Sequence, residues 1–427
     1  MSLNGDNPLG IYISIPFCRS KCTYCNFASG VYPASEHARY VDRLITDITA
    51  SAAWAGQVGV ELPRAADTVY LGGGTPSLLE PELLERLFAA LRAAFDLRAG
   101  AEITVECAPG QLADNTLDAL VAVGVNRVSL GVQSFIDSEA RASGRLHSRA
   151  IVEEDLHRLR KAGIVNLNVD LIAGLAGQTL ASWEESLTIL LRAGVPHASV
   201  YMLEVDEDSR LGREMLAGGA RYSAGLVPSD DTIARMYTQA IERLEHAGIQ
   251  QYEISNFSRP GFESRHNLRY WQRRPYLGLG LDASSMAFAS PAGEAPLTHA
   301  GLNEPRYALR STTTSDLGEF LSGPQPVETS WLSPARQHEE AWFLGLRLNR
   351  GVEPAALVGE FGHKPVARAM EVVSRLREDG LVDTDGKTVR LTAQGQLLSN
   401  DVFQEFLGLD AGEPEQGPPH IRQCLLS

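Results

Sequence analysis

The sequence of 427 residues lacks the features that identify several common protein classes. No apolar run approaches the roughly 18 residues that a membrane-spanning helix needs, and no basic leader with a cleavage site marks the N-terminus. Basic residues are too few to balance the acidic ones: 38 Lys and Arg face 53 Asp and Glu, a net charge of −15. Nucleic acids and anionic lipids are themselves negative, so this balance disfavours both as partners. We therefore expect a cytoplasmic protein with no transmembrane segment.

Biased composition is absent as well. Hydrophobic residues make up 44% of the chain and charged residues 21%, and these ordinary values exclude disordered, collagen-like and coiled-coil classes. At roughly 150 residues per domain, the length predicts two or three domains.

Short β-branched segments alternate with helical patterns over the first 255 residues. The predicted strands are Ile11–Ile15, Thr68–Leu71, Ile103–Cys107, Arg127–Val132, Asn168–Ile172, Ser199–Leu203 and Gln251–Ile254. Helical patterns lie between them, for example at Glu80–Phe95 and Ser182–Ala193. This alternation predicts βαβ units around a parallel sheet, and six or seven such units predict an α/β fold with a full or partial barrel.

The composition changes after the barrel segment, which we assign to residues 1–290. Residues 291–333 are rich in Ser, Thr, Gly and Pro, which predicts a linker. Residues 334–410 predict a second domain with three helices, a hairpin around Asp385-Gly386 and a final helix over Ala393–Leu407. This order is similar to a winged-helix module, but the segment is more acidic than basic, which disfavours DNA binding. We expect a loose tail over residues 411–427.

The five cysteines are unevenly distributed, because Cys18, Cys22 and Cys25 stand at CxxxCxxC spacing directly after the first predicted strand. Thiolates are soft ligands suited to iron–sulfur clusters or zinc. A structural zinc site needs four protein ligands, and no nearby His or Cys completes a set. Three thiolates can hold three irons of a 4Fe–4S cluster and leave the fourth iron open. A zinc site completed from a distant segment, or cysteines packed as small hydrophobes, are the alternatives.

Further polar residues follow or end the predicted strands. A glycine-rich turn from Gly72 to Pro76 follows the second strand, where backbone groups can approach a ligand closely. Glu106 ends the third strand, Gln133 the fourth, Asp170 lies in the fifth and Arg145 follows the fourth. Each residue alone is more typical of a structural hydrogen bonder, and the turn alone of an ordinary tight turn. Together, at the carboxyl ends of barrel strands, they favour a shared polar ligand.

These motifs resemble the radical S-adenosylmethionine superfamily and, within it, the oxygen-independent coproporphyrinogen III oxidase family. The resemblance rests on YxxIPFCxxxCxYC, GGGTP, the strand-end Glu, GVQS and NVDLIAG, and it extends from Tyr12 to about Leu407. It implies a three-quarter parallel β/α barrel in which S-adenosylmethionine binds the open iron of a 4Fe–4S cluster through its amino and carboxylate groups. The implied metal ligands are Cys18, Cys22 and Cys25. The implied cofactor-binding residues are Tyr12 and Tyr24 beside the cluster, Gly73, Gly74 and Thr75 at the methionine amino end, and Glu106, Gln133, Arg145 and Asp170 around the methionine and ribose.

Two branches of that family differ in function. The oxidase branch has a further cysteine two positions after the third and a long N-terminal extension. Here Phe27 occupies that position and only eleven residues precede Tyr12, so we expect no coproporphyrinogen decarboxylation, although the oxidase remains the alternative function. The heme chaperone (HemW-type) branch has an HNxxYW motif, and this chain reads HNLRYW from His266 to Trp271.

The resemblance therefore implies a heme chaperone that delivers heme to acceptor hemoproteins, including membrane respiratory enzymes reached by peripheral association. The residue types are compatible with this function. A His ring nitrogen can ligate heme iron, aromatic rings can pack on a porphyrin, and Arg265 and Arg269 can pair with propionates. His266 is thus the predicted heme ligand, while the alternative is a packed or capping histidine.

Overall fold

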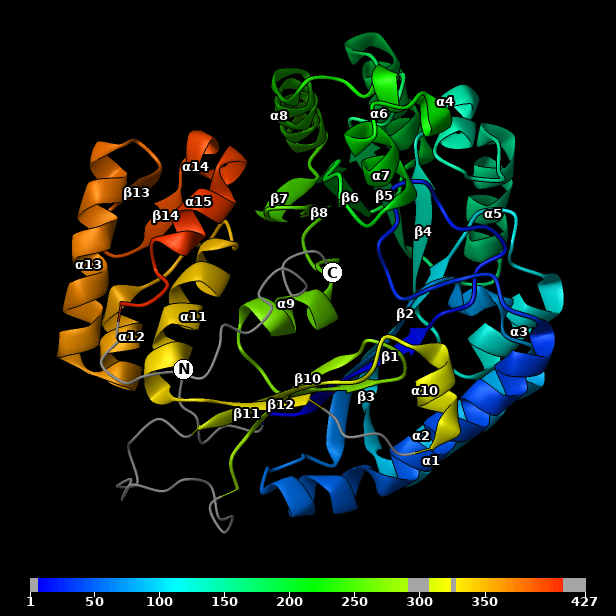
Figure 1. Cartoon of the computed structure of the whole chain (residues 1–427), viewed down its shortest axis with the longest axis horizontal. Coiled ribbons are helices and arrows are strands. Elements are labelled where there is room, and N and C mark those ends of the chain that lie inside the picture. The colour runs from blue at the N-terminus through cyan, green and yellow to red at the C-terminus, as the bar shows by residue number, and fades with distance from the viewer. Residues whose placement is uncertain (1–6, 291–306, 324–327, 410–427) are drawn as a thin grey trace. The chain divides into compact units, whose positions relative to one another are not determined.

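The computed structural model describes residues 7–290, 307–323 and 328–409 (Figure 1). The chain divides into two compact units, the first reaching Trp331 and the second beginning at Leu332. No helix among these residues is long and apolar enough to span a membrane.

A twelve-stranded sheet forms the first unit, in the order β12-β11-β10-β9-β1-β2-β3-β4-β5-β6-β8-β7. Six successive parallel strands make the barrel: β1 (Leu9–Ile15), β2 (Ala65–Gly73), β3 (Asp96–Cys107), β4 (Arg127–Gln133), β5 (Asn166–Ala173) and β6 (His197–Met202). The remaining strands are β7 (Gln250–Glu253), β8 (Asn256–Ser258), β9 (Tyr276–Leu279), β10 (Ser284–Phe288), β11 (Ala308–Thr312) and β12 (Glu328–Leu332). The predicted partial parallel barrel is therefore present.

Helices cover the outer face of this sheet (Figure 1). They are α1 (Ala34–Val58), α2 (Pro81–Ala94), α3 (Asp114–Ala122), α4 (Asp137–Ala142), α5 (Arg149–Lys161), α6 (Leu180–Ala193) and α8 (Asp230–His246). Shorter elements are η1 (Pro76–Leu78), α7 (Arg210–Leu216), η2 (Arg221–Leu226) and α10 (Leu317–Ser322). Each long helix buries an apolar stripe, as α2 does with Leu84, Leu87 and Leu91.

Alternation along the strands separates an apolar outer face from a polar interior. In β4, Val128, Leu130 and Val132 are buried hydrophobics, whereas Arg127 and Ser129 alternate with them. The helix α9 (Arg265–Trp271) lies on the inner side of the sheet (Figure 1). There, the His266 ring lies 2.8 Å from the Thr68 hydroxyl of β2.

The second unit contains α11 (Pro334–Leu346), α12 (Pro354–Phe361), α13 (His363–Glu378), the antiparallel pair β13 (Val382–Thr384) and β14 (Val389–Leu391), α14 (Ala393–Leu397) and α15 (Ser399–Gln404). Three helices and a hairpin follow one another as expected. The final helix predicted over Ala393–Leu407 is instead interrupted at Leu398, whose backbone leaves the helical region.

Two further segments differ from the sequence expectations. Gln251–Ile254 was predicted as a barrel strand, but β7 pairs antiparallel with β8 at one end of the sheet. The described part of the predicted linker contains β11, α10 and β12, and β11 pairs with β10. Its Ser and Thr residues suggested a loop, yet Thr is also enriched in strands. Within the predicted linker, residues 291–306 and 324–327 lie outside the described residues, as does the predicted tail.

Candidate functional site

The three-cysteine loop begins directly after β1, and backbone contacts fix its path. The Cys18 N–H donates to the Gly30 carbonyl at 2.9 Å, and the Thr23 N–H donates to the Ser143 carbonyl at 3.0 Å. The Lys21 ammonium donates to the carbonyls of Phe27 and Ser29, both at 3.1 Å. Hydrogen bonds within the loop therefore fix part of the cysteine loop, and a hydrogen bond to Ser143, directly after α4, fixes another part.

The thiols are partly shielded from solvent. Burial raises the pKa values of Cys18 and Cys25, and the Ser29 hydroxyl lowers both. Within the described part of the chain, no three His, Cys, Asp or Glu side chains converge closely enough to hold a single metal ion. Three thiols on one loop are a ligand set that a cluster with several irons can use. The alternative of a zinc site gains no fourth ligand from the described residues.

The GGGTP turn after β2 lies against the cysteine loop. The Gly74 and Thr75 N–H groups donate to the carbonyls of Ile15 and Phe17, both at 2.8 Å. A side chain at Gly74 would place its Cβ 2.8 Å from both of those carbonyl oxygens, so only glycine fits. The Thr75 hydroxyl lies 4.0 Å from the Cys18 sulfur. The turn and the loop thus form one connected surface.

Glu106 at the end of β3 links this turn to the barrel interior. Its carboxylate accepts the Gly73 N–H at 3.0 Å and the Tyr70 hydroxyl at 2.8 Å. Burial, reinforced by the nearby Asp170, raises the pKa of Glu106 to about 7. A neutral solution therefore contains both the carboxylate and the protonated form of this residue.

Asp170, Gln133 and Arg145 complete the polar group on this side. Asp170 accepts the Ser129 hydroxyl at 3.0 Å and the Asn168 amide at 2.7 Å, and burial raises its pKa. Arg145 donates to the Cys22 sulfur at 3.4 Å and to the Gly131 carbonyl.

Gln133 has a left-handed backbone conformation with φ of 69°, at an irregularity in the β4–β5 pairing. Its Oε1 is buried without a hydrogen-bond partner among the described residues. An orphaned acceptor of this kind, with the Arg145 guanidinium nearby at Gly131, fits a ligand that carries an amino or hydroxyl donor.

The two tyrosines expected beside the cluster lie in different places. Burial raises the pKa of Tyr24, and Cys22 adds to this shift while Arg145 opposes it, so Tyr24 borders the cysteines. Tyr12 lies inside the barrel, with its ring 6.1 Å from that of Tyr70 and 6.5 Å from that of His266. Tyr12 therefore belongs with the interior group around Glu106.

His266 does not lie with these residues on the carboxyl ends of the strands. We call that end, with the cysteine loop, the GGGTP turn, Glu106 and Gln133, the rim, and we call the opposite region around α9 the floor. At the floor, His266 is only 1% exposed. Its Nδ1 is 2.8 Å from the Thr68 hydroxyl and its Nε2 is 2.9 Å from the Tyr270 hydroxyl. Burial lowers its pKa well below the ordinary value, so the ring is neutral.

In the structure, the side chains of the HNxxYW motif at the floor are packed rather than exposed. Both ring nitrogens of His266 are engaged, and its backbone N–H donates to Glu102 at 3.0 Å. Arg269, an expected propionate partner, is fully buried and donates to Asp67 and to the Pro8 and Pro275 carbonyls. In this conformation His266 is a packed histidine, which was the alternative to a heme ligand.

Sequence reasoning missed several interior residues. Tyr70, Arg127, Ser129 and Asn168 surround the two interior carboxylates through hydrogen bonds or charge. The signal that could have revealed them is the alternation of polar residues along β4 and β5.

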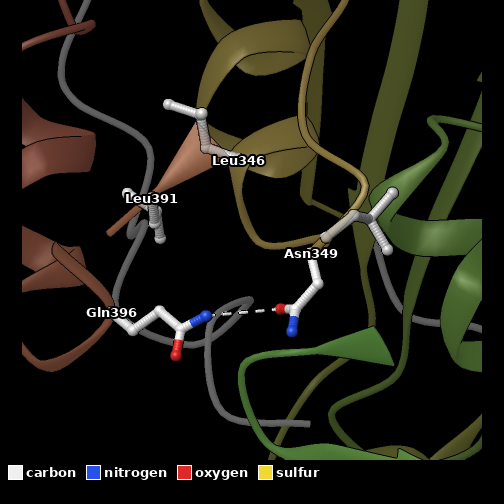
Figure 2. Close-up of a pocket in the computed structure, with 5 residues that line it drawn as sticks. Leu346, Asn349, Leu391 and Gln396 are labelled. Atoms are coloured by element: carbon white, nitrogen blue, oxygen red, sulfur yellow. Dashed lines mark hydrogen bonds between the residues drawn. The ribbon is translucent and has the colours of Figure 1, made fainter. Parts of the chain in front are cut away.

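A small cavity of about 170 Å³ lies in the second unit (Figure 2). Its lining residues are Leu346, Leu348, Asn349, Leu391 and Gln396. The Gln396 side-chain amide donates to Oδ1 of Asn349 at 3.5 Å. None of these side chains titrates, so the cavity offers no acid–base or nucleophilic chemistry.

Comparison with known proteins gives matches over both units. The family model of the Radical SAM superfamily matches residues 12–190, and that of the HemN C-terminal domain matches residues 332–398. Among solved structures, coproporphyrinogen III oxidase (HemN) from Escherichia coli superposes with a TM-score of 0.76 at 23% identity, covering 94% of this chain and 90% of that one. At this identity the likeness establishes the fold, and the predicted barrel with its C-terminal module is confirmed.

Curated relatives cover nearly the whole chain. The sequence is 32% identical over 400 residues to the heme chaperone HemW of Lactococcus lactis, which covers 94% of this chain and 97% of that protein. It is 33% identical over 402 residues to the heme chaperone HemW of Bacillus subtilis, with coverage of 93% and 98%. A mitochondrial radical S-adenosyl methionine domain-containing protein 1 of Bos taurus is 30% identical over 94% of this chain.

Proposed function

The chain belongs to the heme chaperone HemW family of radical S-adenosylmethionine proteins, and on this premise we propose that it binds heme and delivers it to acceptor hemoproteins. The observation that carries the proposal is the similarity over nearly the full length to relatives of that name. The acceptors we propose are respiratory hemoproteins. A 4Fe–4S cluster and S-adenosylmethionine are the accompanying cofactors.

The rim residues supply the cofactor site in this proposal. Cys18, Cys22 and Cys25 hold three irons, and the connected GGGTP turn presents its backbone to the methionine end of the cofactor. Glu106, Asp170 and the Gln133 oxygen accept hydrogen bonds from the cofactor's amino and ribose hydroxyl groups, and Arg145 donates to its carboxylate. Bound to a reduced cluster, S-adenosylmethionine supplies one-electron chemistry. The chain's own residues orient it, and the orphaned Gln133 oxygen supports this assignment.

Heme ligation by His266 requires that the floor open. The Nε2 atom becomes available only when its contact with Tyr270 at 2.9 Å is broken. Complete release of the ring also breaks the contact with Thr68 at 2.8 Å. We therefore propose that heme binds in two steps, with movement of α9 before iron ligation. Such a requirement slows association, because the binding-competent state is the minor one.

Heme titration of the purified, cluster-containing protein tests the proposal. We expect one heme per chain, with affinity reduced at least tenfold in His266→Ala and association faster in Tyr270→Phe, which frees Nε2. His246→Ala is the matched control, since His246 is exposed on α8. Unchanged heme affinity and iron spectrum in His266→Ala would show that another residue ligates iron. Failure to bind heme, together with anaerobic turnover of coproporphyrinogen III, would overturn the chaperone function in favour of the oxidase.

A further inference from the structure

A single layer of side chains crosses the barrel interior at the height of Arg127. Parallel pairing aligns Tyr12 with Tyr70, Tyr70 with Thr104, Thr104 with Arg127, and Arg127 with Asn166. Residues in register on adjacent strands point to the same face of a sheet. Arg127 therefore shares the interior face with Ser129, which donates to Asp170.

Arg127 is buried in this layer without matched hydrogen bonding. It is only 2% exposed, and its Nε has no hydrogen-bond partner among the described residues. The same is true of Thr104 Oγ1 and Asn166 Oδ1, its neighbours in register. A buried guanidinium is costly unless opposite charges compensate it. The compensation must therefore come from charge across the interior rather than from a close ion pair.

Two interior carboxyl groups provide that charge. Burial raises the pKa of Glu106 to about 7 and also raises that of Asp170, while Arg127 lowers both. The groups facing Glu106 are Asp170, the Tyr70 hydroxyl, the Gly73 N–H and Arg127. Those facing Asp170 are Ser199, Ser129, Asn168 and Arg127, and the Arg145 guanidinium also interacts with Asp170. The phenols of Tyr12 and Tyr201 also border these carboxyls and stay neutral, since burial raises the pKa of both. Arg127 is the cation common to both carboxyl environments.

We propose that Arg127 is a positioning residue for the S-adenosylmethionine site: its buried guanidinium, on the same interior face as Ser129 and Asp170, favours the charged forms of Glu106 and Asp170. Ionised Glu106 is the stronger acceptor for the Gly73 N–H, so the same charge orders the GGGTP turn. Arg127 itself lies one layer deeper than Glu106, because Ser129 and not Arg127 pairs in register with Glu106. The inference rests on the proposed function, in which these two carboxylates contact the cofactor.

The direction in which S-adenosylmethionine affinity changes with pH follows from the ionisation of the carboxyl groups. Cofactor binding requires the ionised form, which predominates above the pKa of Glu106. Removing the Arg127 charge raises that pKa, so the pH at which affinity reaches half its maximum moves upward. We expect Arg127→Gln to bind S-adenosylmethionine roughly fivefold more weakly at pH 7, where half of wild-type Glu106 is ionised, and with nearly wild-type affinity at pH 9.

The experiment measures S-adenosylmethionine affinity by calorimetry from pH 6 to 9, with the cluster-loaded, oxidised protein. The cofactor's own amino group titrates identically in every variant, so the comparison isolates the protein. Arg127→Lys retains the positive charge and should keep the wild-type midpoint. Arg158→Gln removes an arginine that pairs with Asp155 on α5, outside the interior, and should lower the melting temperature without moving the midpoint.

Several outcomes distinguish this inference from the proposed function. An Arg127→Gln variant weakened equally at every pH, or an Arg127→Lys variant with a displaced midpoint, would overturn the electrostatic role. If Arg127→Gln fails to fold, the Lys variant and the double variant Arg127→Gln/Glu106→Gln remain, and the double variant should fold and lose the pH dependence assigned to Glu106. If Glu106→Gln binds the cofactor as wild type at every pH, the proposed cofactor site itself is wrong.

Discussion

The rim and the floor of the barrel differ in how their polar groups are satisfied. At the rim, Gln133 Oε1 is buried without a partner among the described residues, and Cys18 and Cys25 are only partly buried. At the floor, both ring nitrogens of His266 are hydrogen-bonded and Arg269 donates to three oxygens. The rim has the character of a site prepared for a ligand, and the floor that of a closed structural layer. The rim thus offers a ligand a buried acceptor, Gln133 Oε1, that no described residue already occupies.

Among the substitutions that separate the two ends, loss of a cluster cysteine should have the largest effect, and that effect should be confined to the rim. Cys22→Ser should remove the iron–sulfur absorbance and lower the iron content, because a hydroxyl is a poor replacement for a thiolate ligand. Cys107→Ala is the matched control: Cys107 is buried at the end of β3, outside the CxxxCxxC motif, and should leave the cluster intact. Four irons per chain retained in Cys22→Ser would show that the ligand set is wrong.

Acid should affect the two ends in opposite directions. Burial holds the pKa of His266 below its ordinary value, so the unfolded chain takes up a proton first and the floor loses stability as pH falls below about 6.5. Glu106 has its pKa raised to about 7, so its contribution to stability increases as pH falls from there towards the ordinary value of a carboxyl group. Each buried group changes the free energy of unfolding by up to about 1.4 kcal/mol per pH unit at pH values between its pKa in the folded chain and its pKa in the unfolded chain.

Chemical unfolding between pH 7 and pH 5 measures this opposition. Glu106→Gln removes the rim contribution, so the stability of this variant should fall more steeply with acid than that of wild type. His266→Ala removes part of the floor contribution and should fall less steeply, although its stability at pH 7 is lower. Parallel stability curves for all three proteins would contradict the assignment of opposite contributions.

The sequence indicates which residues meet at the rim more directly than which residues are buried at the floor, because the rim motifs are local. CxxxCxxC and GGGTP each lie within one loop after one strand, and the parallel order of strands brings those loops together. The HNxxYW motif predicts little about exposure, since the contact that buries His266 joins residues 198 positions apart. The sequence did not predict a role for Arg127 for a similar reason. One charged residue at the start of a strand does not show that the residues paired with it on the neighbouring strands, Thr104 and Asn166, are uncharged.

Tyr70 connects the two ends, so its substitution tests whether they respond independently. Its hydroxyl donates to Glu106 at 2.8 Å, while its ring lies 5.3 Å from that of His266. Tyr70→Phe keeps the ring and removes only the hydrogen bond, which lowers the pKa of Glu106. We expect S-adenosylmethionine affinity at pH 7 to fall by a few-fold, corresponding to about 1 kcal/mol, with heme association unchanged. Tyr70→Leu removes both contacts, so it should weaken cofactor binding to the same extent and also loosen the packing around His266. A change in heme association in Tyr70→Phe would mean that the rim and the floor are energetically coupled.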